Sequence, residues 1–73
     1  MLTMTAAEHR VRLTPRERET VQAILDGCTN REIADRLGLR EQTVKNALSV
    51  VYEKFHVRSR LALAREALRN GEW

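Results

Sequence analysis

Residues that interrupt or cross-link a chain are scarce in this sequence. One proline and three glycines stand among 73 residues. The commonest residue types are Arg, Leu, Ala and Glu, all good helix formers. The single cysteine, Cys28, excludes an internal disulfide and fits a reducing cytosol, so we expect a cytoplasmic protein. These scarcities favour a helical domain without covalent cross-links.

Long apolar runs and aromatic residues are also lacking. No apolar run approaches the length of a membrane span, and the first residues show no signal-peptide pattern, so we expect no contact with a membrane. There is one Phe, one Tyr and one Trp, so aliphatic side chains and Ala must form the core. The chain is long enough for one domain at most, and helical domains of this size often gain stability by self-association.

The groups that catalysis and metal binding require are missing as well. Cys28 has no His or acidic residue at catalytic spacing, and His9 and His56 have no companions that would complete a zinc site. The sequence has no glycine-rich phosphate loop. We therefore expect no enzyme, no cofactor, no metal and no small-molecule ligand within this domain.

Positive charge gathers in the second half of the chain. The net charge is +3, and residues 43–60 hold an equal excess through Lys45, Lys54, Arg58 and Arg60, opposed by Glu53 alone. Localised positive charge is typical of a protein that binds a polyanion. On charge alone, an ordinary solvated helix face explains the pattern equally well.

Start and stop signals of helices recur four times along the chain. Two of them are capping boxes, in which a Thr is followed three residues later by Glu. Glycines follow the first, second and last apolar stripes, and no strand pattern appears. We predict an all-α fold of four helices in a domain over residues 13–73, preceded by a flexible arm over residues 1–12. The predicted helices lie between Thr14 and Gly27, Thr29 and Gly38, Glu41 and Phe55, and Ser59 and Gly71.

Each predicted helix has an apolar stripe that we expect to face the core. The stripes are Val21, Ile24 and Leu25; Ile33, Ala34 and Leu37; Val44, Leu48, Val51 and Phe55; and Leu61, Ala64 and Leu68. The last helix has a second apolar strip, Leu63 and Ala67, which exceeds what a small core needs. We therefore predict a homodimer through Leu63, Ala67 and Trp73, although a surface Leu by itself is common.

The second and third predicted helices are joined by a turn of three residues, Gly38, Leu39 and Arg40. Two helices that cross so closely need small residues between them. Ala34 leaves room for the crossing, Gly38 adopts positive φ without a Cβ penalty, and Val44 fills the space between the helices. This spacing is typical of a helix-turn-helix.

Several separate motifs in order resemble the LuxR-type, or GerE-like, helix-turn-helix family. They are Leu13–Glu19, Thr29–Ala34, Thr43–Asn46 and Val57–Arg60, and the resemblance extends from about Leu13 to Gly71. It implies a four-helix fold, a recognition helix in the major groove and dimers formed largely through the last helix. The length is similar to that of free-standing members, while other members have this domain as the C-terminal output module of response regulators and quorum-sensing receptors.

The outward side of the helix from about residue 41 to 55 supplies the candidate DNA contacts. An amine there can reach a phosphate or a guanine, and an amide can contact adenine. The resemblance assigns DNA contacts to Thr43, Lys45 and Asn46. For Lys54 we keep open both a phosphate and a nearby carboxylate. The full predicted set is Arg31, Arg40, Gln42, Thr43, Lys45, Asn46, Ser49, Lys54, Arg58 and Arg60.

Four positions depart from the family pattern. Arg40 stands where the family usually has a capping Ser, so the recognition helix loses a side-chain cap. Ala47 and Val50 replace a frequent His and a frequent Asn, either as core residues or as an apolar surface for a thymine methyl or a protein. His56 replaces a frequent Gly, and we expect the turn to survive with strain.

Our leading hypothesis is a sequence-specific bacterial transcription regulator that binds double-stranded DNA as a homodimer, with RNA polymerase as a further candidate partner. The alternative is a protein-interaction module in which the former DNA-reading side binds a partner. A sigma-factor-like helix-turn-helix fits the motifs less well. Which of the first two is right depends on whether the chain binds DNA in a salt-dependent way.

Overall fold

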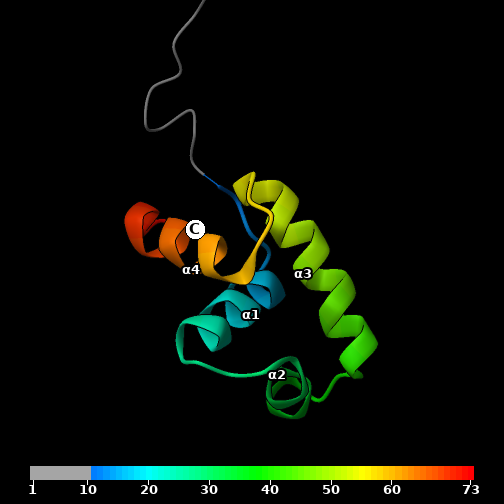
Figure 1. Ribbon diagram of the computed structural model, residues 1–73. Helices are drawn as coiled ribbons and strands as arrows, with labels where there is room; N and C mark the ends of the chain where they lie inside the picture. The colour runs from blue at the N-terminus through cyan, green and yellow to red at the C-terminus, as the bar shows by residue number, and fades with distance from the viewer. Residues whose placement is uncertain (1–10) are drawn as a thin grey trace, which may run out of the picture.

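The computed structural model describes residues 11–73, and the chain there forms four α-helices and no strand (Figure 1). This confirms the predicted all-α fold. Residues 1–10 of the predicted arm lie outside the described residues. The helices are α1 (Pro15–Leu25), α2 (Asn30–Leu37), α3 (Glu41–Phe55) and α4 (Arg60–Asn70).

The starts of α1 and α2 are fixed by the two predicted capping boxes. The Thr14 hydroxyl accepts from the Glu17 amide at 3.1 Å, and the Thr14 amide donates to the Glu17 carboxylate at 2.8 Å. Thr29 and Glu32 repeat the arrangement at 3.2 and 2.8 Å. Each box satisfies two backbone amides that a helix start leaves without partners, so local sequence alone sets these boundaries.

The core is aliphatic and joins all four helices. Val21 of α1, Ile33 of α2, Val51 of α3 and Leu63 of α4 are each 0% exposed. The predicted stripe of α3 is buried over its full length, from Val44 to Phe55. Figure 1 shows α1 at the centre, with α3 and α4 on either side of it and α2 at one end. One face of α3 is therefore covered and the opposite face is left to solvent.

The crossing of α2 and α3 has the geometry that the sequence predicts. Gly38 ends α2 with φ 67°, and Ala34 and Val44 are 4% and 1% exposed where the helices meet. The Leu39 amide donates to the Ala34 carbonyl at 2.9 Å, which closes the turn. The positive φ explains the glycine, because a Cβ in this conformation is strained.

The inward face of α4 differs from the prediction. Leu63 and Ala67 are buried in the monomer, whereas Leu61 is 63% and Leu68 is 72% exposed. The prediction that Leu63 and Ala67 form a dimer contact was therefore wrong, because their side chains already pack in the core. Both strips recur at helical spacing, so periodicity could not choose between them. Trp73 is half-buried, and its indole N–H donates to the Ala67 carbonyl at 2.9 Å, so it serves the monomer too.

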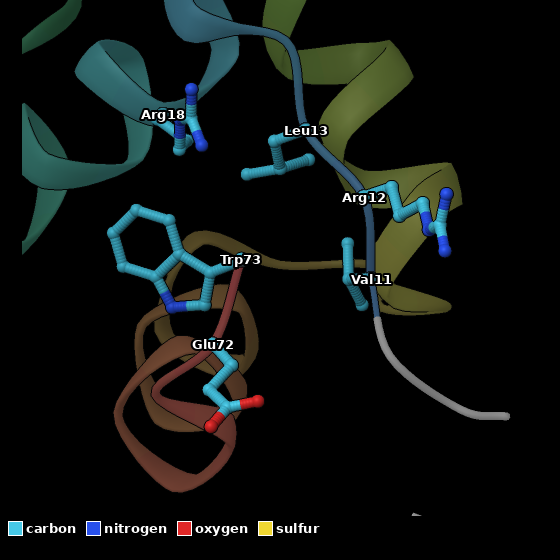
Figure 2. A pocket seen from close by; sticks show the side chains of 6 residues that line it. All are labelled: Val11, Arg12, Leu13, Arg18, Glu72 and Trp73. Carbon is cyan, nitrogen blue, oxygen red and sulfur yellow. The ribbon is translucent and has the colours of Figure 1, made fainter. Parts of the chain in front are cut away.

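Part of the predicted arm is attached to the domain. Val11 and Leu13 pack against the core, and an open cavity of about 430 Å³ lies between this segment and the C-terminal Trp73 (Figure 2). The cavity is lined by Val11, Arg12, Leu13, Arg18, Glu72 and Trp73.

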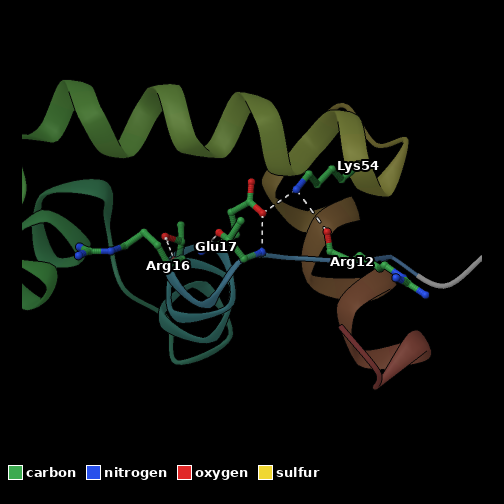
Figure 3. A network of polar contacts seen from close by, with 6 residues as sticks. Arg12, Arg16, Glu17 and Lys54 are labelled. Atoms are coloured by element: carbon green, nitrogen blue, oxygen red, sulfur yellow. Dashed lines mark hydrogen bonds and ion pairs between the residues drawn. The ribbon is translucent and has the colours of Figure 1, made fainter.

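A polar network joins the start of α1 to the end of α3 (Figure 3). The Lys54 ammonium donates to the Glu17 carboxylate at 2.7 Å and to the Arg12 carbonyl at 3.3 Å. The Glu17 side chain is 12% exposed and that of Lys54 is 35% exposed. Burial opposes ionisation of Glu17, but the hydrogen bonds from Lys54 and Thr14 outweigh it and hold the pKa of this carboxyl below its ordinary value.

Two exposed carboxylates have lowered pKa values as well. The hydrogen bond from Arg36, with a second from Gln22, lowers the pKa of Asp26, and the Thr29 backbone amide lowers that of Glu32. A group whose pKa is lower in the folded state stabilises the fold above its unfolded pKa, here about 4. That contribution disappears as the pH falls through the lower folded value. The domain therefore loses stability in acid.

We predict that Glu17→Gln lowers the free energy of unfolding by about 1–2 kcal/mol at neutral pH, because Gln keeps the capping box but loses the charge opposite Lys54. The variant should also lose less stability than the wild type when the pH is lowered below about 4. Urea titrations at neutral and acidic pH measure both quantities.

Glu32→Gln is the matched control, since Glu32 occupies the same place in a capping box without a lysine partner. Glu32→Gln should lower the free energy of unfolding by less than Glu17→Gln does. Equal losses in the two variants would show that the Lys54 contact adds nothing to the box.

Candidate nucleic-acid interface

The solvent-facing side of α3 gathers half of the predicted DNA contacts on one helix surface. Val44, Leu48, Val51 and Phe55 are buried, so the residues between them project outward. Five predicted site residues are exposed there: Gln42, Thr43, Lys45, Asn46 and Ser49. An exposed helix face of amides, hydroxyls and an amine is well suited to contact base edges and phosphates.

Two side-chain hydrogen bonds orient groups on this face. The Gln42 amide donates to the Asn46 side-chain oxygen at 3.0 Å, and this leaves the Asn46 NH₂ group pointing to solvent as a donor. The Ser49 hydroxyl donates to the Lys45 carbonyl at 3.2 Å, so its oxygen remains an acceptor. The face thus presents both donors and acceptors in fixed positions.

The start of α3 has no side-chain cap. Arg40 is the N-cap residue with φ −79° and ψ 149°, and its guanidinium makes no capping bond, as the departure from the family pattern predicts. Backbone amides of the first turn are left without intrahelical partners at the positive end of the helix dipole. Together with the exposed Arg40 and Thr43, they offer an anion several donors.

The predicted contacts on α2 and near the start of α4 differ in whether their side chains have partners within the domain. Arg31 and Arg58 are exposed, and neither side chain has a partner within residues 11–73. Arg60 is half-buried, and its guanidinium donates to the Asn30 side chain at 2.7 Å and to the Cys28 carbonyl. Arg60 therefore has a structural role, because these bonds fasten α4 to the α1–α2 connection at Cys28 and to the first residue of α2.

Lys54 also has a partner within the fold. Of the two alternatives the sequence left open, the structure shows the carboxylate, Glu17. Two similar contacts, made by Arg16 and Arg36, were not predicted from the sequence. Arg16 donates to the Leu37 carbonyl at 3.2 Å and so caps the end of α2, and Arg36 pairs with Asp26 at 2.9 Å. Each of these contacts joins two segments that are separate in the sequence, so a local sequence pattern does not reveal it.

Three further positions on α3 and at its end differ from the family pattern. His56 is the C-cap with φ 56°, the one non-glycine residue with positive φ within the described chain, as expected. Ala47 is half-buried and Val50 is 43% exposed. Residues 11–73 contain no cluster of potential metal ligands. None of their helices is both long and apolar enough to cross a membrane.

Comparison with known proteins identifies the fold and its use. The profile of the family described as bacterial regulatory proteins, luxR family, matches residues 11–67. The chain belongs to the luxR family. It is thus a helix-turn-helix domain for DNA-binding transcription regulation and not an enzyme. This confirms the resemblance seen in the motifs from Leu13 to Gly71.

Relatives of very different length contain this luxR-type domain. The chain is 40% identical over 60 residues to the spore germination protein GerE of Bacillus subtilis, covering 82% of the chain and 81% of that protein. It is 41% identical over 59 residues to the transcriptional regulatory protein DegU of Brevibacillus brevis, of which it spans 25%. It is 42% identical over 59 residues to the putative regulator Mb0914c of Mycobacterium bovis, of which it spans 7%.

We predict opposite roles for two neighbouring arginines. Arg60→Ala removes bonds to Asn30 and Cys28 and should lower the free energy of unfolding by about 1–3 kcal/mol. Arg58→Ala removes an exposed side chain and should change it by less than about 0.5 kcal/mol. Thermal and urea unfolding of the two variants test this, and equal stability of both would contradict the structural role of Arg60.

Proposed function

We propose that the domain is a sequence-specific transcription regulator that inserts α3 into the major groove of double-stranded DNA. The observation that supports this is the division of α3 into a buried apolar stripe and an exposed polar face. Lys45 and Asn46 lie in the first two turns, where recognition helices contact base edges. Lys45 contacts guanine or phosphate, and Asn46 contacts adenine or another base acceptor.

Phosphate contacts surround this face in the proposal. Arg40 and Thr43 lie beside the free amides at the start of α3, while Arg31 and Arg58 are exposed on α2 and before α4. Phosphate contacts hold the recognition helix in register without reading sequence themselves. Because Arg60 and Lys54 bond within the domain, we no longer assign them to DNA.

We further propose that the domain binds its operator as a homodimer through the outward face of α4. Leu61 and Leu68 are seven residues apart, and both are among the most exposed large hydrophobic residues of the described chain. Seven residues are about two helical turns, so the two leucines share one face. A two-fold contact of this face with its copy would match a palindromic site. Contact with RNA polymerase and a cytoplasmic location remain predictions.

Fluorescence anisotropy with a labelled duplex at several salt concentrations tests DNA binding. We expect a linear fall of log affinity with log salt, with a slope of about 0.9 for each phosphate neutralised. Lys45→Ala should weaken binding, whereas Arg69→Ala removes the same charge from α4 and should not. Binding that is absent or insensitive to salt would instead favour the protein-interaction module.

We expect Leu68→Glu to shift the domain from dimer to monomer in sedimentation equilibrium, because it places charge in the apolar contact. The monomer should remain folded, since Leu68 is 72% exposed. Arg69→Ala, on the same helix, should leave the dimer intact. A wild type that is already monomeric both free and on DNA would refute the dimer.

A further inference from the structure

An apolar patch interrupts the polar face of α3. Val50 is 43% exposed, and Ala47 beside it is half-buried. The other large hydrophobic residues of residues 11–73 with comparable exposure, Leu61 and Leu68, both lie on α4. A single exposed valine is ordinary on a protein surface. Val50, however, lies on the face of α3 that we propose contacts DNA, so its apolar side chain would face the major groove.

Helical spacing joins the patch to the polar contacts. Thr43, Ala47 and Val50 follow one another at four and three residues, so their methyl groups lie along one strip of α3. Asn46 is four residues before Val50 and is its neighbour on the exposed face. The exposed face therefore has an amide strip and a methyl strip side by side.

We propose that Val50, with Ala47 beside it, reads the C5 methyl group of a thymine in the major groove. This inference rests on the proposed function. The thymine methyl is the apolar group that the major-groove edges of the four bases offer, and the remaining groups there are hydrogen-bond donors and acceptors. Valine cannot bond those groups, so placing it over another base removes water from them without compensation.

The spacing of residues on α3 limits where the thymine lies. A rise of about 1.5 Å per residue separates Asn46 and Val50 by about 6 Å along the helix. Base pairs are about 3.4 Å apart, so we expect the thymine within about two base-pair steps of the base that Asn46 contacts. A protein partner on this patch would have to cover the adjacent Asn46 and Lys45, whose polar groups favour DNA instead.

The test begins with duplexes selected by the full chain from a random pool. In the enriched duplex each thymine is replaced singly by deoxyuridine, which removes the methyl group and leaves base pairing unchanged. We expect one replacement in each half-site to lower wild-type affinity about fourfold, the worth of one buried methyl group. In Val50→Ala the same replacement should have no effect, because the two changes remove one contact.

Arg69→Ala is the control, since it trims an exposed side chain outside both α3 and the proposed dimer contact and should retain the fourfold thymine preference. Circular dichroism checks that Val50→Ala keeps its helices, as expected for an exposed residue. An enriched duplex that tolerates every uridine, or a uridine effect that persists in Val50→Ala, would overturn this inference alone. Failure to enrich any duplex would overturn the proposed function with it.

Discussion

The close crossing of α2 over α3 is the constraint on which the rest of this domain depends. Ala34 and Val44 are nearly fully buried at the crossing, and Gly38 makes the turn with a positive φ that a larger residue would strain. This contact fixes the rotation of α3 about its axis. Because the stripe from Val44 to Phe55 must face the core, Lys45 and Asn46 have no choice but to face solvent. The packing of small residues thus determines which side chains are available to DNA.

Eight of the 13 Lys and Arg residues divide between the fold and the candidate interface. Arg16, Arg36, Lys54 and Arg60 each bond to an oxygen of a segment distant in sequence, and they hold the helices in place. Arg31, Arg40, Lys45 and Arg58 are exposed, with side chains that have no partner within residues 11–73. The total of 13 Lys and Arg residues therefore overstates the number of cations that DNA can use. Salt dependence of binding should reflect the second group, since each DNA phosphate that one of these charges neutralises releases condensed counterions from the DNA.

Most of the fold could be read from the sequence because its signals are local. The two capping boxes, Gly38 and the apolar stripe of α3 each act within one helix or turn, and the structure has them as expected. The face of α4 could not be read, because Leu61 with Leu68 and Leu63 with Ala67 fit helical spacing equally well. What decides between them is how α4 packs against α1 and α3, with Arg60 at its start bonded to Cys28 and Asn30. The roles of Arg16, Lys54 and Arg60 were hidden for the same reason, since each partner lies more than 20 residues away.

Neither end of α3 has the residue that would stabilise it best. Arg40 gives the helix no side-chain cap, and His56 ends it in a left-handed conformation that favours glycine. Isolated helices of this length are marginal in water, so α3 must draw its stability from its buried middle. Its uncapped first turn then keeps backbone amides free beside an arginine. A phosphate bound there would supply the cap that the sequence omits, so DNA binding at the proposed interface would also cap α3.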